Sequence, residues 1–216
     1  MKYKAVLFDL DGTLLDTLQD IAESVNKALH QLGFPQHELT AYKYFVGDGR
    51  EALAVHSLPE LHRDDTTVRK LVDLINTEYA KCWPEHTHPY QGIAALLDAL
   101  TIRNFKLAIL TNKEHELSQE MVSETLSRWH FDVVVGASPL APKKPDPTVA
   151  LQIARRLEIH PAEIVYLGDS DIDMKTAIGA GMYPVGASWG FRTRDELVAA
   201  GAEALIEHPS DLLRFL

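Results

Sequence analysis

Ala5-Val6-Leu7-Phe8-Asp9-Leu10-Asp11-Gly12-Thr13 is the stretch of this 216-residue sequence that decides the fold. Its first four residues form a continuous apolar run, which is typical of a β-strand buried on both faces of a parallel sheet. Two carboxylates and a glycine follow directly. We therefore expect the strand to end at Phe8 and to present Asp9 and Asp11 in the loop beyond it.

Similar apolar runs recur along the chain, and helical patterns separate them. Strands are expected at residues 106–110, 133–135, 164–167 and 183–186, with a weaker one at 204–206. Apolar residues spaced three and four apart predict helices around residues 93–100, 117–126 and 149–157. This alternation predicts an α/β fold, a Rossmann-like three-layer sandwich with a central parallel sheet.

Residues 16–87 depart from this rhythm. A helical stripe runs from Leu18 to Leu32 and ends at Gly33 and Pro35, and further helical stretches follow with no convincing strand. We interpret residues 16–87 as a small α-helical domain, inserted into a core domain that comprises residues 1–15 and 88–216.

Composition restricts the functional class. The 21 Lys and Arg against 31 Asp and Glu give a net charge of -10, which argues against binding to nucleic acids or anionic membranes. Cys82 is the single cysteine, so no intramolecular disulfide is possible, and a reduced, cytoplasmic setting fits. No apolar run approaches the ~20 residues that a membrane span needs.

Polar side chains follow three of the expected strands. They are Asp9 with Asp11, then Thr111 with Asn112, and then Asp169 with Asp171 and Asp173, while Lys143 and Lys144 lie in a loop. Ligands of open α/β sheets bind beyond the carboxyl ends of the strands, so these groups converge if the first strand is central. Several carboxylates together need a cation, and oxygen ligands suggest Mg²⁺. Because an aspartate can also be phosphorylated, the residue types favour phosphoryl transfer.

Four motifs, in this order, make the chain similar to the haloacid dehalogenase-like superfamily, in particular its phosphatases with a helical cap. The resemblance covers nearly the whole chain, and the inserted helices match the cap of the phosphoglycolate phosphatase-like and β-phosphoglucomutase-like branch. The motifs are Asp9-Leu10-Asp11-Gly12-Thr13, Leu110-Thr111-Asn112-Lys113, Lys144-Pro145-Asp146-Pro147 and Gly168-Asp169-Ser170-Asp171-Ile172-Asp173.

The resemblance implies roles for the carboxylates. Asp9 would be the nucleophile that forms an aspartyl-phosphate, and Asp11 would be the general acid and then the general base. Mg²⁺ would bind the Asp9 carboxylate, the Asp11 carbonyl oxygen and Asp169. Asp173 would be a further ligand or, as we favour, a residue behind the ligands that holds the metal's water.

The resemblance also implies how the phosphate is held. Thr111 and the Asn112 backbone would bind the phosphoryl group, and Lys144 would neutralise charge on the nucleophile and the phosphate. We choose Lys144 over Lys143 because it directly precedes the proline of the motif. Asp171 is read as a surface or capping carboxylate.

The cap is expected to select the substrate, a small phosphorylated metabolite. Gly47, Gly49 and Arg50 lie where the cap of this branch faces the active site, and Arg50 offers a fork for a carboxylate or phosphate. Phosphoglycolate is the first guess for this reason. A β-phosphoglucomutase-like sugar phosphomutase and a non-catalytic binding module are the alternatives, and a monomer and a homodimer are both open.

Overall fold

The computed structural model describes residues 2–216, and the chain divides into two compact units. One unit comprises Met1–Leu15 and Pro89–Leu216, and the other comprises Asp16–His88. None of the helices in the described residues is long and apolar enough to cross a membrane.

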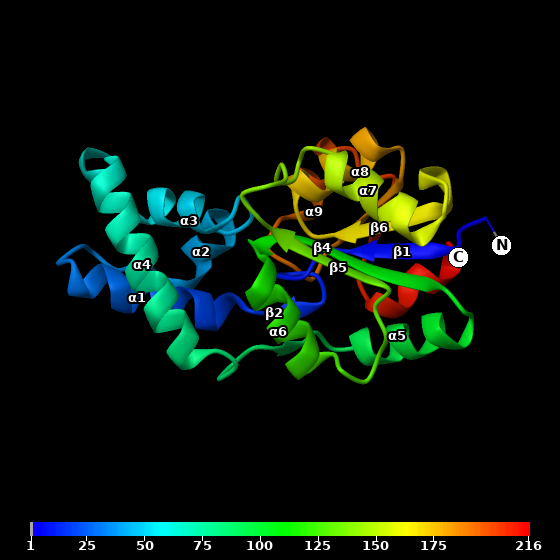
Figure 1. Ribbon diagram of the computed structural model, residues 1–216, viewed down its shortest axis with the longest axis horizontal. Coiled ribbons are helices and arrows are strands. Elements are labelled where there is room, and N and C mark those ends of the chain that lie inside the picture. Colours follow the sequence, from blue (N-terminus) through cyan, green and yellow to red (C-terminus); the bar gives the residue numbers. More distant parts are fainter. Residues whose placement is uncertain (1) are drawn as a thin grey trace. The chain divides into compact units, whose positions relative to one another are not determined.

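The first unit is built on a six-stranded sheet in the order β5-β4-β1-β6-β7-β8, in which every neighbouring pair is parallel (Figure 1). β1 is central, as the convergence of the polar groups requires, and all four of its residues are buried because they have neighbours on both faces and both edges. The strands are β1 (Ala5–Phe8), β4 (Lys106–Glu114), β5 (Val133–Ala137), β6 (Ile164–Gly168), β7 (Tyr183–Ala187) and β8 (Ala204–Ile206).

Helices cover both faces of this sheet, so the predicted α/β three-layer fold is confirmed. Figure 1 places α7, α8 and α9 on one face and α5 and α6 on the other. On the first of these faces, Leu7 and Tyr166 of the sheet pack with Ile153 of α7 in one buried cluster. The helices of this unit are α5 (Ile93–Ile102), α6 (His115–Thr125), α7 (Thr148–Leu157), α8 (Asp171–Ala180) and α9 (Arg194–Ala199), with the 3₁₀ turns η2 (Pro161–Glu163) and η3 (Pro209–Arg214).

The second unit is helical. α1 and α4 pack against one another through buried faces, with Val25 and Leu29 buried on α1 and Leu71 and Ile75 buried on α4. The buried residues on each helix follow the three-and-four spacing that the sequence shows. The elements are α1 (Leu18–Gln31), α2 (Leu39–Phe45), α3 (Arg50–Ser57), η1 (Glu60–His62) and α4 (Asp65–Cys82).

Two features of the strands differ from expectation. The connections between the units form a two-stranded sheet of β2 (Leu15–Asp16) and β3 (His88–Pro89), and strands of two residues leave no periodic pattern in a sequence. β4 continues beyond residue 110 to Glu114, and its register with β5 shifts between Leu110 and Glu114. Such an irregularity re-aims side chains, and here it falls on residues 111–113.

Candidate active site

Asp9 lies directly beyond the central strand. Its backbone N–H donates to the Leu167 carbonyl oxygen at 3.0 Å, which continues the sheet pairing one residue past β1. Its carboxylate oxygen Oδ1 lies 2.8 Å from Lys144 Nζ. The Asp9 carboxylate is therefore held at the carboxyl end of the sheet by its backbone and by one buried ammonium.

Lys144 joins two of the carboxylates. Its ammonium lies 2.8 Å from Asp9 Oδ1 and 2.7 Å from Asp173 Oδ1, and its side chain is only 3% exposed. The Asn112 side chain fixes the Lys144 backbone, because Nδ2 donates to the Lys144 carbonyl at 3.0 Å and Oδ1 accepts the Lys144 N–H at 2.9 Å. From the sequence we predicted a role for the Asn112 backbone only; the contact of its side-chain amide with Lys144 was not predicted.

Asp169 follows β6 and is equally constrained. Thr13 Oγ1 donates to Asp169 Oδ1 at 3.0 Å, and the Phe191 N–H donates to Asp169 Oδ2 at 2.8 Å. Gly12 and Gly190 lie so close that a Cβ on either would meet the Asp169 side chain at 2.3 Å. The carboxylate fills a space that exists only because both neighbours lack a side chain.

Asp173 has both carboxylate oxygens occupied by protein donors. Oδ1 accepts from Lys144 and, at 3.3 Å, from the Tyr166 hydroxyl. Oδ2 accepts from the N–H and the hydroxyl of Ser170, in a capping box that begins α8. These contacts leave Asp173 better suited to holding Lys144 than to coordinating a metal ion directly.

The proximity of these buried groups shifts their pKa values. Burial, followed by the charge of Asp173, raises the pKa of Asp9 well above its usual range, although Lys144 opposes the shift. Burial and Asp173 likewise raise the pKa of Asp169 to about 7. Burial opposes the charge on Lys144, but Asp173 and Asp9 outweigh it and raise its pKa well above normal.

The arrangement fits a divalent cation. Oxygen atoms of Asp9, Asp169 and Asp173 lie within 4.8 Å of one another, and all three residues are buried. A cation among them would favour the charged carboxylates, and so oppose the burial and the mutual repulsion that raise the pKa of Asp9 and Asp169. The donor set contains only oxygen, which suits a hard dication.

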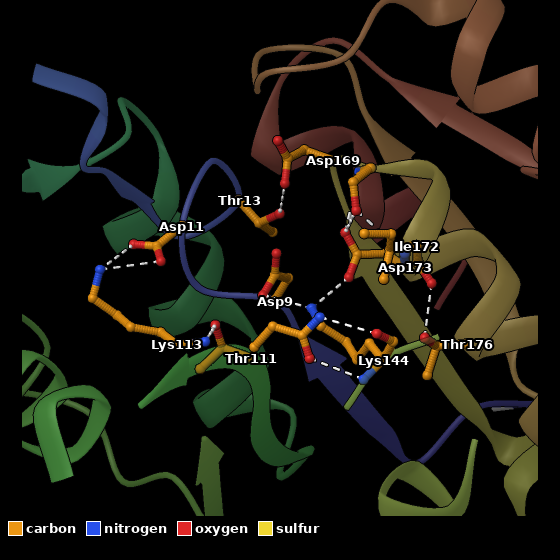
Figure 2. Close-up of polar contacts among 12 residues, drawn as sticks. Asp9, Asp11, Thr13, Thr111, Lys113, Lys144, Asp169, Ile172, Asp173 and Thr176 are labelled. Atoms are coloured by element: carbon orange, nitrogen blue, oxygen red, sulfur yellow. Dashed lines mark hydrogen bonds and ion pairs between the residues drawn. The ribbon is translucent and has the colours of Figure 1, made fainter. Parts of the chain in front are cut away.

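Asp11 and Lys113 form a second, partly buried ion pair near Asp9 (Figure 2). Lys113 Nζ lies 3.1 Å from Asp11 Oδ1 and 3.2 Å from Asp11 Oδ2. Lys113 belongs to one of the four sequence motifs, but no role was predicted for it. The sequence does indicate it in one way: a basic residue directly follows Thr111 and Asn112.

Of the remaining predicted site residues, Thr111 belongs to the first unit and the other three belong to the helical unit. Thr111 is buried, and its Oγ1 accepts the Lys113 N–H at 3.2 Å, as Figure 2 shows. Gly47, Gly49 and Arg50 belong to the other unit, so they are described separately. Gly49 has a φ of 90° and precedes α3, whose first residue, Arg50, donates to Asn76 Oδ1 of α4.

Lys143 and Asp171 were expected to lie outside the site, and neither belongs to the ion pairs around Asp9. Lys143 is exposed, whereas its neighbour Lys144 is buried. Asp171 pairs with Lys175 one turn further along α8, at 2.5 Å between Oδ2 and Nζ. Neither side chain takes part in the Asp9–Lys144–Asp173 contacts.

Comparison with known proteins identifies relatives along nearly the whole chain. The family model of the haloacid dehalogenase-like hydrolases matches residues 6–187. A phosphoglycolate phosphatase of Aquifex aeolicus (strain VF5) is 30% identical over 213 residues, which cover 99% of this chain and 96% of the relative. Another phosphoglycolate phosphatase, of Nitrosospira multiformis, is 32% identical over 206 residues, 94% of this chain and 91% of the relative.

A solved structure shares the whole fold. The crystal structure of a predicted phosphoglycolate phosphatase from Haemophilus somnus 129PT superposes with a TM-score of 0.92 at 23% identity, and covers 100% of this chain and 98% of its own. At that identity the likeness concerns the fold alone. Together with the family match over residues 6–187, it shows that this chain belongs to the haloacid dehalogenase-like hydrolases.

Proposed function

We propose that this protein is a Mg²⁺-dependent phosphatase of small phosphorylated metabolites and that Asp9 is its nucleophile. Two observations carry the proposal together: the Lys144 ammonium contacts both Asp9 and Asp173, and the oxygen atoms of Asp9, Asp169 and Asp173 lie close enough to hold one metal ion. This arrangement offers a carboxylate, a fixed positive charge and a place for a dication at one point. Phosphoryl transfer needs these three components together.

The first half of the reaction transfers the phosphoryl group to the protein. An oxygen of the Asp9 carboxylate forms a bond to phosphorus while the bond from phosphorus to the leaving oxygen breaks. Asp11 gives its proton to that leaving oxygen. Thr111, the Asn112 backbone and the Lys144 ammonium hold the phosphoryl oxygens.

The second half restores the protein. A water oxygen forms a bond to phosphorus, Asp11 takes the proton of that water, and the bond from phosphorus to Asp9 breaks. Phosphate leaves, and both carboxylates return to their starting state. Bound Mg²⁺, held by Asp9, Asp169 and the Asp11 carbonyl oxygen, would neutralise the charge that the phosphate and the carboxylates share.

Phosphoglycolate is the substrate we propose first. The two relatives described above are named phosphoglycolate phosphatases, and each aligns with nearly the whole chain. In the helical unit, which we propose as a cap that closes over the substrate, Arg50 supplies a cation suited to the substrate's carboxylate. Gly47 and Gly49, both with positive φ, shape the turn before it. The single buried cysteine, Cys82, supports a cytoplasmic setting.

Hydrolysis of phosphoglycolate and p-nitrophenyl phosphate, measured with Mg²⁺ and with EDTA, tests the proposal. We expect turnover that EDTA abolishes, and Asp9→Asn should lose it while its circular dichroism spectrum stays that of the wild type. An absence of metal-dependent turnover would instead favour a binding module. Acid-stopped reactions with a sugar phosphate that yield an isomeric sugar phosphate, and no inorganic phosphate, would favour a phosphomutase.

A further inference from the structure

Both carboxylate oxygens of Asp11 accept hydrogen bonds from one lysine. Lys113 Nζ lies 3.1 Å from Oδ1 and 3.2 Å from Oδ2, and the two side chains are only 6% and 11% exposed. An ion pair on the surface would contribute little to stability, because water screens the two charges and both side chains stay mobile. This pair is largely removed from water, so its geometry is restrained.

The backbone fixes both ends of the contact. Asp11 lies in a tight turn in which the Gly12 N–H donates to the Leu15 carbonyl at 2.9 Å. Lys113 lies in the irregular part of β4, where the register with β5 shifts, and its N–H donates to Thr111 Oγ1 at 3.2 Å. A regular strand would place alternate residues on opposite faces, whereas a bulge re-aims side chains.

Asp9 and Asp11 thus each pair with a different lysine: Lys144 is buried, and the side chain of Lys113 is 6% exposed. Lys144 contacts Asp9 and Lys113 contacts Asp11, and Figure 2 shows Lys113 on the side of Asp9 opposite Asp173. We propose that Lys113 is a positioning residue, which holds the Asp11 side chain where it exchanges a proton with the leaving oxygen. This inference rests on the proposed function.

The contact is compatible with proton transfer. An ammonium has three donors and no acceptor, so Lys113 can stay bonded to one Asp11 oxygen while the other oxygen carries the transferable proton. A proton transfer in the transition state needs the donor within hydrogen-bond reach of the acceptor. Without Lys113 the Asp11 side chain would lose this restraint while its backbone stays in place.

Two substrates with different leaving groups separate this role from others. The alkoxide of phosphoglycolate needs a proton as it leaves, whereas p-nitrophenolate is stable without one. The ratio kcat/KM reports steps up to formation of the phosphorylated enzyme. A fault in positioning Asp11 therefore lowers kcat/KM for the alkyl phosphate selectively, and a fault in phosphate binding or folding lowers both.

Lys113→Met is the main variant. We expect kcat/KM to fall about 10- to 100-fold for phosphoglycolate and less than about threefold for p-nitrophenyl phosphate, since a general acid contributes 10²- to 10⁴-fold. Lys113→Arg, which keeps the cation, should recover most of the selective loss. Lys113→Met should add no selective loss to Asp11→Asn, because the two residues act through one contact.

Lys106→Met is the matched control. Lys106 lies at the other end of the same strand, is exposed, and pairs with Asp132 at 2.7 Å. Its removal should leave both activities unchanged. Lys113→Gln, a smaller neutral change, replaces Lys113→Met if that variant does not fold, as judged by circular dichroism.

The possible failures are distinguishable. Wild-type turnover with equal losses for both substrates in the Lys113 variants would overturn the role of Lys113 alone. A further selective loss when Lys113→Met is added to Asp11→Asn would do the same. Absence of wild-type turnover would overturn the proposed function itself, and this inference with it.

Discussion

Lys144→Met is predicted to destabilise the protein because it removes a charge that two buried carboxylates share. The side chain of Lys144 is 3% exposed, that of Asp173 is 0% exposed, and that of Asp9 is 11% exposed. Methionine fills a similar volume, so the change leaves the packing largely intact and removes the ammonium. Asp173 then keeps its Ser170 and Tyr166 donors but loses the ion pair with Lys144.

The magnitude follows from burial. Removing one partner of a buried ion pair costs about 3–5 kcal/mol, because the remaining charge is left uncompensated in a poorly solvated site. The ammonium's own desolvation penalty disappears with it and offsets part of the loss. We therefore expect the free energy of unfolding at pH 7, without metal, to fall by about 3 kcal/mol or more.

Urea denaturation in EDTA measures this difference, with Lys143→Met as the matched control. Lys143 is the adjacent lysine and is exposed, so its replacement should change stability by less than about 0.5 kcal/mol. The slope against urea should not change, so the midpoint alone reports the effect. If the urea midpoint of Lys144→Met equalled that of the Lys143→Met control, the Lys144 ammonium would not stabilise the protein through its buried ion pairs.

The remaining predictions concern the helical unit, the glycine beside Asp169, and pH. Asp20 is fully buried and accepts hydrogen bonds from the backbone N–H groups of His86 and Thr87. Asp20→Ala should lower the free energy of unfolding, measured by urea denaturation, by about 2–4 kcal/mol, because these buried donors lose their acceptor; an unchanged midpoint would contradict this. Gly12→Ala should lower metal-dependent turnover at least about 100-fold in a folded protein, since the new Cβ would meet Asp169 Oδ2 at 2.3 Å; activity within a few-fold of wild type would show that Asp169 can move freely. Because the pKa of Asp169 is raised to about 7 from 3.8, the folded metal-free protein holds a proton that the unfolded chain releases, so stability should fall as pH rises from about 4 to 7. Mg²⁺ should then raise the thermal midpoint more at pH 8 than at pH 6, and a shift that is larger at pH 6 would contradict the sign.

The sheet was predictable because its strands are buried on both faces. Ala5–Phe8 and Ile164–Gly168 have continuous apolar runs, and their order around β1 brings Asp9 and Asp169 to one edge. The strand ends carry polar residues whose types indicate the chemistry. Residue types and strand order together therefore predicted which carboxylates converge.

Features that depend on local backbone geometry were not predictable. The direction of the Lys113 side chain follows from a register shift in β4, which no periodicity in the sequence marks. The Asn112 amide binds the Lys144 backbone from 32 residues away, a contact that depends on how the end of β4 meets the loop that contains Lys144. The two-residue strands β2 and β3 are too short to leave a pattern.

Trapping the phosphorylated enzyme tests the central claim most directly. The enzyme would be mixed with ³²P-labelled substrate and Mg²⁺, quenched with acid within milliseconds, and digested for peptide mapping. We expect label on the peptide that contains Asp9. Hydroxylamine should release it, as it releases an acyl phosphate, and the Asp9→Asn variant should carry none. Rapid release of phosphate with no labelled protein, or label on any other residue, would contradict it.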